Sequence, residues 1–267
     1  MSNILLSYYR YQDLSHVKLL IKKIGTPRYH PGSFHLPFGD IVYVDIASFE
    51  SQYYEIFCQK CYSFNSDNQC PKIIDCGGNI GLATLWFKKE YPEASITVYE
   101  ANSKLAKIIN RNIVKFGFKD IDVINAAVWN KEGYVNFKAS RGDAGVISKN
   151  KQDATVKSIN LSDQITQPID LLKMDIEGAE YNVLLDLCET GKISFIKKII
   201  CEIHGTANKS YRLGEMLSEL SNLGFHVTTN HARTQKELYD YLEPTPFPAV
   251  SDGKFLLHLY AWKDTSH

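Results

Sequence analysis

Strand-like and helix-like segments alternate along most of the chain beyond residue 70. Short apolar runs rich in β-branched residues predict strands, and segments whose apolar residues recur every three to four positions predict helices. The predicted strands cover residues 72–75, 95–99, 121–125, 169–174, 198–202, 225–229 and 254–262. The predicted helices cover residues 80–89, 103–116, 179–187 and 210–223. Because strands that alternate with helices form parallel sheets covered on both faces, we predict an α/β fold.

One stretch inside this region departs from the alternation. Apolar residues over 127–159 recur at a period closer to two, with turn signals at 131–133 and 141–143. This pattern predicts a β-hairpin insertion at the edge of the sheet. Further along, a proline-rich loop over 243–252 leads into the last predicted strand.

Residues 1–70 lack the alternation and form a predicted N-terminal lead-in. Prolines and glycines over 25–40 predict loop and turn, and the apolar run 41–45 predicts a short strand. Residues 48–64 begin with a serine suited to cap a helix and carry apolar residues at helical spacing. We therefore expect a small cap followed by a main domain of residues 71–267.

The composition is that of a globular protein with a packed core, since 44% of the 267 residues are hydrophobic and 22% are charged. Thirty basic and thirty acidic residues cancel, and no long basic run stands out. Nucleic acid is therefore not expected as a partner. Polar residues interrupt the first 24 positions, and no apolar run approaches the roughly 18 residues of a membrane span, so we expect a cytoplasmic protein without a membrane span.

The six cysteines fit reduced thiols better than a disulfide framework. Cys58 and Cys61 form a CxxC pair, which raises the alternative of a zinc site. The pair lies in a helix-like stretch and no second CxxC pair follows it. Buried thiols are therefore the preferred interpretation, and no metal site is predicted there.

A glycine-rich turn follows the first strand of the α/β region. Residues 75–81 read D-C-G-G-N-I-G, and their glycines let the backbone turn sharply and approach a ligand closely. In a dinucleotide-binding fingerprint the first glycine would fall on Cys76, and the Asp75 carboxylate would repel a pyrophosphate on the next helix N-terminus. The sulfonium-bearing amino acid of S-adenosylmethionine tolerates such a carboxylate. The turn therefore favours S-adenosylmethionine over a nicotinamide cofactor.

Glu100 ends the next strand, 19 residues beyond Gly81. A carboxylate there can accept hydrogen bonds from both hydroxyls of a ribose, although NAD sites use the same device. Ala126 lies in the turn after the third strand, where a small residue suits the flat adenine ring. The predicted cofactor-binding residues are Asp75, Gly77, Gly78, Asn79, Gly81, Glu100 and Ala126.

A second group of polar residues closes the fourth and fifth strands. Residues 173–180 read K-M-D-I-E-G-A-E, and the next strand delivers a glutamate and a histidine two positions apart. Residues two apart on a strand face the same side, and these strand ends should be neighbours. The predicted reaction centre consists of Asp175, Glu177, Glu202 and His204. Glu180, early in the following helix, is predicted to be a charge partner of the helix terminus.

A histidine or carboxylate at this position can take the proton of an acceptor hydroxyl during methyl transfer. The same side chains could instead hold a divalent cation such as Mg²⁺, which would lower the pKa of that hydroxyl. The pattern favours a base acting without a metal ion, and Mg²⁺ stays the alternative.

Together, residues 75–81, Tyr99-Glu100, the motif at 173–180 and Glu202-Ile203-His204 resemble the FkbM family of methyltransferases. The resemblance covers residues 70–205, and the motif K-x-D-x-E-G-x-E is its specific part. It implies a Rossmann-like class I methyltransferase fold with a seven-stranded, mostly parallel sheet and an antiparallel last strand. It also implies transfer to a hydroxyl of a sugar, a glycan precursor or a secondary metabolite.

Three other functions stay open. An N-methyltransferase often carries Asn/Asp-Pro-Pro-Tyr/Phe where this chain has residues 175–178. A nicotinamide-dependent oxidoreductase is disfavoured by Asp75 and Cys76, and a catalytically silent cofactor-binding subunit is disfavoured by the convergent acids. The expected partner is a small-molecule or glycan acceptor, and a homo-oligomer is compatible with the sequence.

Overall fold

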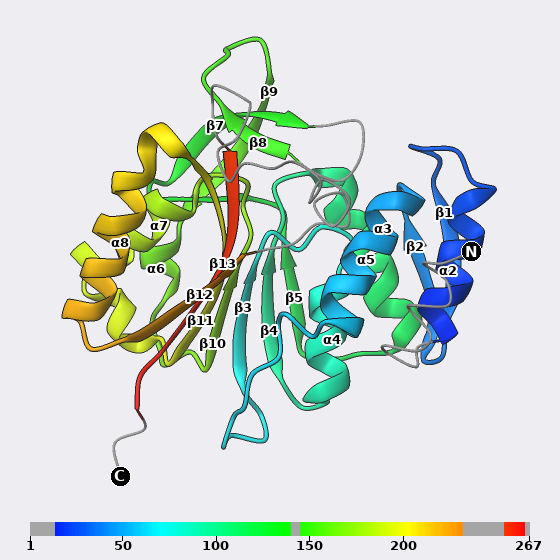
Figure 1. Cartoon of the computed structure of the whole chain (residues 1–267), viewed down its shortest axis with the longest axis horizontal. Coiled ribbons are helices and arrows are strands. Elements are labelled where there is room, and N and C mark those ends of the chain that lie inside the picture. The colour runs from blue at the N-terminus through cyan, green and yellow to red at the C-terminus, as the bar shows by residue number, and fades with distance from the viewer. Residues whose placement is uncertain (1–13, 140–144, 232–253, 265–267) are drawn as a thin grey trace, which may run out of the picture.

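The computed structural model describes residues 14–139, 145–231 and 254–264. At its centre lies a sheet of seven strands: β3 (Lys72–Cys76), β4 (Ser95–Tyr99), β5 (Ile121–Ile124), β10 (Leu171–Met174), β11 (Lys198–Thr206), β12 (His226–His231) and β13 (Lys254–Trp262). Their order is β12-β13-β11-β10-β3-β4-β5 (Figure 1). Strands β11, β10, β3, β4 and β5 are parallel, whereas β13 runs antiparallel to both of its neighbours. This arrangement confirms the predicted fold class.

Helices cover both faces of the sheet because its strands are apolar on both sides. The main helices are α4 (Leu82–Glu90), α5 (Ser103–Phe116), α6 (Leu161–Gln164), α7 (Glu180–Glu189) and α8 (Ser210–Asn222). Helices α4 and α5 lie on one face, and α6, α7 and α8 lie on the other (Figure 1). Successive residues of β3 serve different cores: Ile73 packs with the α4–α5 side and Ile74 with the α7–α8 side.

The lead-in packs on the α4–α5 side of the sheet. It contains α2 (Leu14–Ile24), β1 (Gly32–Leu36), β2 (Gly39–Tyr43), α3 (Ile46–Tyr53) and the π-helical turn η1 (Tyr54–Cys58). Its aromatic residues Phe49, Tyr53 and Phe57 share one hydrophobic core with Trp86 of α4. Asn112 of α5 joins the two parts through hydrogen bonds with both backbone groups of Val42.

Two predictions about the lead-in were wrong. The stretch 25–40, predicted as loop and turn, contains β1, which pairs with β2 as an antiparallel hairpin. The predicted single helix over 48–64 is instead α3 followed by η1, and its cap is Asp45 because that carboxylate accepts a hydrogen bond from the backbone N–H of Ser48. The prediction erred because apolar periodicity does not distinguish an α-helical turn from a π-helical one.

The insertion after β5 forms a small sheet of its own. Its strands are β6 (Ala127–Trp129), β7 (Gly133–Ala139), β8 (Gly145–Ser148) and β9 (Ala154–Asn160), in the order β6-β9-β7-β8. The predicted hairpin is present as the antiparallel pair β7–β8, but it belongs to this separate sheet and does not extend the main sheet beyond β5. Figure 1 shows the small sheet above the upper end of the main sheet. The predicted turn at 141–143 lies largely outside the described residues.

Two short 3₁₀ helices, η2 (Lys192–Phe195) and η3 (Ala207–Lys209), complete the described chain. The predicted loop over 243–252 lies outside the described residues. Among the helices that are described, none is long and apolar enough to cross a membrane.

Candidate active site

Two cavities adjoin at the carboxyl ends of the parallel strands, where open α/β sheets bind ligands. The first cavity is lined by Gly77, Asn79, Tyr99, Glu100, Ala101, Asn102, Leu105, Ala126, Ala127, Val128, Phe137, Gly145, Ile147, Asp175, Ile176 and Glu177. The second cavity is lined by Ser48, Ser51, Gln52, Glu55, Ile56, Tyr62, Gly77, Gly78, Asn79, Ala83, Lys173, Asp175, Glu177 and Glu202. The residues common to both are Gly77, Asn79, Asp175 and Glu177.

The glycine turn lies against the end of β4 and against the loop after β10. The backbone N–H groups of Gly77 and Gly78 donate to the carbonyl oxygen of Tyr99 at 2.9 and 3.1 Å. Gly77 has a φ of +86°, and a Cβ at this position would lie 1.8 Å from the carbonyl oxygen of Asp175. Only glycine therefore fits between the two loops at residue 77.

The other two predicted glycines serve the turn itself. A Cβ on Gly78 would lie 2.4 Å from Val98, so Gly78 allows the turn to pack against β4, and its backbone lines only the second cavity. Gly81 adopts a left-handed conformation, with a φ of +91°, and begins α4. Gly81 lines neither cavity.

Asp75 lies beneath the turn and lines neither cavity. Its fully buried carboxylate lies 3.0 Å from Nζ of Lys173 and accepts a hydrogen bond from the Thr84 hydroxyl at 2.8 Å. Lys173 also donates to the carbonyl oxygen of Gly77 at 2.8 Å. Asp75 was predicted to contact the cofactor directly. The structure instead gives it a supporting position, in which Asp75 pairs with Lys173 and Lys173 binds the backbone of the turn.

Lys173 was expected near the mouth of the cofactor site as part of the motif at 173–180, but it was given no role there, although it stands in the apolar run of β10. Burial lowers the pKa of Lys173, but the charges of Asp75 and Asp175 outweigh burial and raise that pKa overall. The lysine is therefore a permanent cation. The sequence did hold a signal for Lys173, namely a lysine inside an apolar strand, because a buried charge must be paired with an opposite charge.

Glu100 forms the polar end of the first cavity. Its two carboxylate oxygens accept hydrogen bonds from the backbone N–H groups of Asn79 and Asn102, each at 2.8 Å. Burial raises the pKa of Glu100 to about 7, and the two N–H donors offset part of that rise. Each oxygen keeps a lone pair that can accept a further hydrogen bond.

Asn79 is the second polar residue of this cavity with unmet hydrogen-bonding capacity. Its backbone is left-handed, with a φ of +52°. Its Oδ1 atom is buried and accepts no hydrogen bond from any residue that the structure describes. A buried acceptor of this kind calls for a donor from a ligand or from water.

The opposite end of the first cavity is apolar and includes the predicted residue Ala126. Val128 extends this surface, and the small sheet adds Phe137 from β7 and Ile147 from β8. The contribution of the insertion was not predicted, because sequence periodicity indicates strands but not where their sheet will lie.

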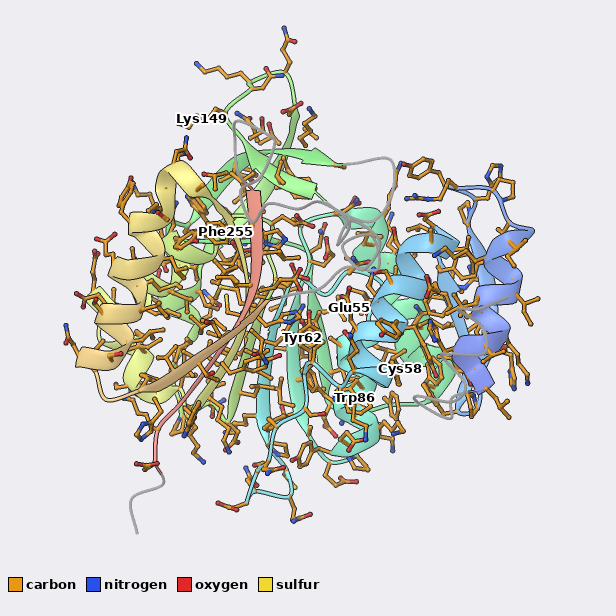
Figure 2. The ribbon with its side chains drawn as sticks, in the orientation of Figure 1. Glu55, Cys58, Tyr62, Trp86, Lys149 and Phe255 are labelled. Carbon is orange, nitrogen blue, oxygen red and sulfur yellow. The ribbon has the colours of Figure 1, made fainter. Side chains whose placement is uncertain are left out.

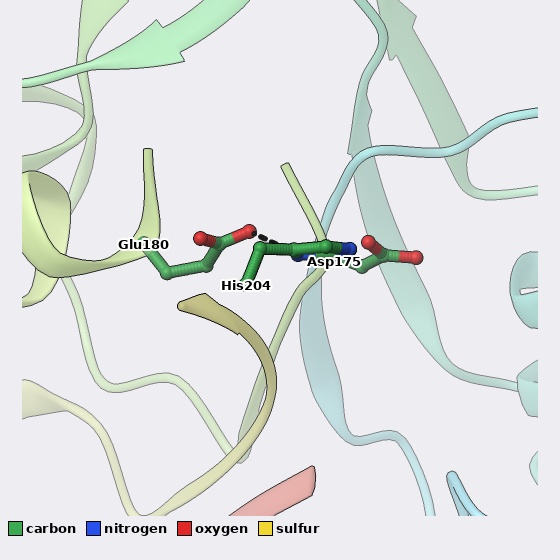
Figure 3. Close-up of side chains that lie close together, drawn as sticks. All are labelled: Asp175, Glu180 and His204. Atoms are coloured by element: carbon green, nitrogen blue, oxygen red, sulfur yellow. Dashed lines mark hydrogen bonds and ion pairs between the residues drawn. The ribbon is translucent and has the colours of Figure 1, made fainter. Parts of the chain in front are cut away.

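His204 stands among three carboxylates from two different elements. Its Nδ1 atom lies 3.1 Å from Glu180, and its Nε2 atom lies 3.4 Å from Glu177 and 3.7 Å from Glu202. Figure 3 shows the imidazole between Glu180 and Asp175. Burial lowers the pKa of His204, but the bond to Glu180 and the surrounding charges outweigh it and raise the pKa to about 10. The ring is therefore cationic at neutral pH.

Glu180 organises the loop that joins β10 to α7. Its fully buried carboxylate accepts hydrogen bonds from the backbone N–H groups of Ile176 at 3.1 Å and of Gly178 at 2.9 Å, and it receives His204 as well. Glu180 lies in the first turn of α7, the position in which it was predicted to face the helix terminus, and its pairing with His204 was not predicted. The same bonds hold Glu177 in a left-handed backbone conformation, with a φ of +56°.

Asp175 and Glu202 share the second cavity and repel each other. Burial and the nearby Glu202 raise the pKa of Asp175 well above its usual range. Burial alone would raise the pKa of Glu202, but its bond to His258, at 3.2 Å, and the charges of His258 and His204 lower it overall. Strand β11 continues to Thr206, so Glu202 lies within the strand and not at its predicted end.

The predicted Mg²⁺ alternative gains no support from these side chains. Ligand atoms of Asp175, Glu180 and His204 all lie within 4.8 Å of one another. Both Glu180 oxygens, however, accept backbone N–H groups, and Nδ1 of His204 is directed at the same carboxylate. Oε1 of Glu180 and Nδ1 of His204 are thus engaged with each other and with backbone N–H groups, as in an ion-pair network.

The fold is that of class I methyltransferases. A crystal structure of methyltransferase FkbM from Methylobacillus flagellatus superimposes with a TM-score of 0.50 and 13% identity, covering 97% of this chain and 58% of that one. A SAM-dependent methyltransferase from Agrobacterium tumefaciens gives a TM-score of 0.51 at 14% identity, covering 89% of this chain and 71% of that one.

The methyltransferase FkbM domain model matches residues 75–227, more than half of the chain, so the chain belongs to this methyltransferase family. Methyltransferase sdnD of Sordaria araneosa is 24% identical over 231 residues, which cover 71% of this chain and 88% of that protein. Methyltransferase 1 of Beauveria bassiana is 25% identical over 162 residues, covering 50% of this chain and 65% of that protein. These matches confirm the resemblance inferred from the glycine turn and the motif at 173–180.

Proposed function

We propose that the chain is an S-adenosylmethionine-dependent O-methyltransferase that acts on a hydroxyl group of a sugar, a glycan precursor or a secondary metabolite. The observation that carries this proposal is the meeting of two cavities at Gly77, Asn79, Asp175 and Glu177. One cavity suits a nucleoside and the other is lined by polar side chains. A methyl group passed between two bound molecules requires such a junction, because the reacting atoms must be held in line.

The residues of the first cavity fit S-adenosylmethionine. The lone pairs of the Glu100 carboxylate suit the two ribose hydroxyls, and the apolar surface of Ala126, Val128 and Phe137 suits adenine. The unpartnered Oδ1 of Asn79 suits the ammonium of the methionine portion. When bound, the cofactor supplies an activated methyl group.

The second cavity suits an acceptor rich in hydrogen-bonding groups. Ser48, Ser51 and Gln52 from α3 form one side, and Asp175 and Glu202 form the other. Hydroxyl and amide groups can pair with the hydroxyls of a sugar-like molecule. His204 carries no free nitrogen toward the acceptor; it keeps the carboxylates of Glu177 and Glu202 in place.

Transfer to an amine is the second candidate, because the acid-rich lining of the second cavity attracts a cationic group. The position of the new methyl group in the product, read by NMR, separates the two reactions. A methyl carbon bonded to oxygen supports the O-methyltransferase, and one bonded to nitrogen overturns it.

The proposal is tested by titrating S-adenosylhomocysteine into the protein by calorimetry, with Glu100→Ala alongside. We expect micromolar affinity for the unmodified protein and at least a ~10-fold loss in the variant, since a good hydrogen bond to a charged group contributes about 1.5–3 kcal/mol. Glu132→Ala, on an exposed turn of the insertion, is the control. Absence of binding to the folded unmodified protein would contradict the proposed function.

A further inference from the structure

Glu55 is an acidic residue of the second cavity that no sequence motif indicates. It belongs to η1 in the lead-in, and it lines the cavity together with Ser51, Tyr62 and Glu202. Figure 2 labels Glu55 and Tyr62. The Ser51 hydroxyl donates a hydrogen bond to its Oε1 atom at 3.3 Å. The Glu55 side chain thus reaches the second cavity, called the acceptor cavity from here on, from the lead-in. The other acids of this cavity come from the main sheet and its loops.

The π-helical turn gives this side chain its direction. Backbone N–H of Gln59 donates to the carbonyl oxygen of Tyr54 at 2.9 Å, five residues earlier, which widens the last turn. A widened turn rotates the residues on it relative to a regular α-helix, and such turns occur frequently at functional sites. Glu55 is the acid on this turn.

Glu55 faces other acidic groups and one histidine. The titratable groups facing it are Glu202 on β11, His258 on β13, Glu50 on α3, and Cys61 and Tyr62 in the following loop. Burial and the charge of Glu202 raise the pKa of Glu55 to about 7, and His258 and Ser51 offset part of that rise. A group with such a pKa exchanges its proton readily at neutral pH.

The other polar groups of the cavity are less suited to accept a proton. Both nitrogens of His204 already face carboxylates. Glu202 is held by His258, and Lys173 is held by Asp75. Asp175 is repelled by Glu202 and stands at the junction with the first cavity, where it bounds the cofactor side. Glu55, by contrast, stands on the acceptor side, and a neutral serine hydroxyl is its hydrogen-bond partner among the described side chains.

We propose that Glu55 accepts the proton of the acceptor hydroxyl, an inference that rests on the proposed O-methyltransferase function. The hydroxyl oxygen forms a bond to the methyl carbon while the bond from that carbon to sulfur breaks, and the electron pair of the broken bond stays on sulfur. The hydroxyl proton passes to the Glu55 carboxylate, which later releases it to water. Charge balances, because a sulfonium becomes a neutral thioether and a carboxylate becomes a carboxylic acid.

The first test is a ¹³C NMR titration of the full-length protein carrying ¹³C-carboxyl-labelled glutamate, with and without S-adenosylhomocysteine. We expect two carboxyl resonances to titrate near pH 7, those of Glu55 and Glu100, and only the Glu55 resonance to vanish in Glu55→Gln. Glu90→Gln, an exposed glutamate on α4, is the matched control and should leave this resonance in place. A Glu55 midpoint near 4.5 would overturn the proposal, and this readout does not require a known acceptor.

The second test uses methyl hexopyranosides as acceptor probes with radiolabelled cofactor. We expect Glu55→Gln to lower kcat by at least ~100-fold with little change in KM, as for loss of a general base, and to abolish a rate increase centred near pH 7. Glu55→Asp should restore part of kcat. An increase in KM alone, with kcat and the pH profile unchanged, would make Glu55 a binding residue and overturn the proposal.

The two proposals fail in different ways. S-adenosylhomocysteine should bind the Glu55→Gln protein within about twofold of its affinity for the unmodified protein, since Glu55 lines only the second cavity. Loss of this binding in the unmodified protein would contradict the proposed function. Unchanged binding with an unchanged kcat in Glu55→Gln would contradict only the role of Glu55.

Discussion

At the scale of single residues, Gly77 carries the tightest steric constraint of the site. Its φ is +86°, and a side chain would place its Cβ 1.8 Å from the Asp175 carbonyl oxygen, so there is no room for one. We expect Gly77→Ala to displace one loop or the other, to lower the stability by ~1–3 kcal/mol and to weaken S-adenosylhomocysteine binding at least ~10-fold. Calorimetry and urea unfolding measure the two effects.

Gly117→Ala is the control for this variant. Gly117 also has a left-handed backbone, with a φ of +66°, but no atom lies within 4 Å of the position of its Cβ. We expect Gly117→Ala to lower the stability by ~1 kcal/mol through the backbone conformation alone. Its affinity for S-adenosylhomocysteine should be unchanged. Equal losses of affinity in both variants would contradict the steric role of Gly77.

Glu100 gives the cofactor cavity a pH dependence. Because burial raises its pKa to about 7, a growing fraction of this carboxylate is protonated below neutrality. Ribose hydroxyls donate to the ionised form, so affinity for S-adenosylhomocysteine should rise with pH through about 7 and level off above it. Calorimetry between pH 5.5 and 8.5 measures this. In Glu100→Gln the dependence should disappear, and a slope that persists there would assign it to another group.

The same raised pKa affects stability in the opposite direction. A carboxyl group whose pKa is higher in the folded than in the unfolded chain binds its proton more tightly when folded. The contribution of the Glu100 carboxyl to the free energy of unfolding is therefore fully present below the pKa that this group has in the unfolded chain. It is lost as the pH rises toward about 7. Ionised Glu100 thus costs folding free energy at the pH where the proposed ribose contact requires the ionised form.

At the scale of helices and strands, the small sheet is the element whose function sequence reasoning missed. Phe137 of β7 and Ile147 of β8 line the first cavity. We expect Phe137→Ala to weaken S-adenosylhomocysteine binding about 5- to 20-fold, because the contact with the ligand is only part of the roughly 1.5–3 kcal/mol that full burial of an apolar side chain contributes. Binding is measured by calorimetry, with folding monitored by circular dichroism.

Tyr134→Ala is the matched control on the same strand. Tyr134 is 77% exposed, whereas Phe137 is buried. The Tyr134 side chain therefore lies in solvent, while Phe137 on the same strand lines the first cavity. We expect the affinity of Tyr134→Ala to stay within about twofold of the unmodified protein. Equal affinity in both variants would show that the small sheet does not contribute to the cofactor cavity.

The elements that sequence reasoning located correctly are those with local signals. The helix predicted over 103–116 begins after Asn102, whose side chain caps it, and ends at Gly117 in a left-handed conformation. Strands 95–99 and 254–262 also agree with the structure. Pairing between distant segments leaves no such signal. The insertion was therefore recognised as β-structure, but its sheet partners were not.

The site was predictable to the extent that its residues follow strand ends. Gly77, Asn79, Glu100 and Ala126 meet in one cavity as expected, and Asp175 and Glu177 stand at its junction with the second. Glu55 could not be found in this way, because its position depends on how the lead-in packs against the sheet. The indirect role of Asp75 depends on its burial, which sequence alone does not reveal.

At the scale of the whole molecule, the acceptor cavity depends on the docking of the lead-in onto the sheet. The lead-in supplies Ser48 and Glu55 to this cavity and shares a hydrophobic core with α4 and α5. Asn112 of α5 is buried and bonds to the N–H and carbonyl of Val42 and to the carbonyl of Ile80, at 2.8 to 3.1 Å. One side chain therefore connects the lead-in, α5 and the glycine turn.

We expect Asn112→Ala to lower the free energy of unfolding by ~2–4 kcal/mol, because one buried and two half-buried backbone groups lose their partners at once. Asn110→Ala on the same helix should change it by less than ~0.5 kcal/mol, since Asn110 is exposed. Urea unfolding measures both values. If the lead-in and the sheet form one cooperative unit, the Asn112→Ala protein will still unfold in a single transition at lower urea. Two separate transitions would instead support independent domains divided near residue 70, and the acceptor cavity would then lie between parts able to open.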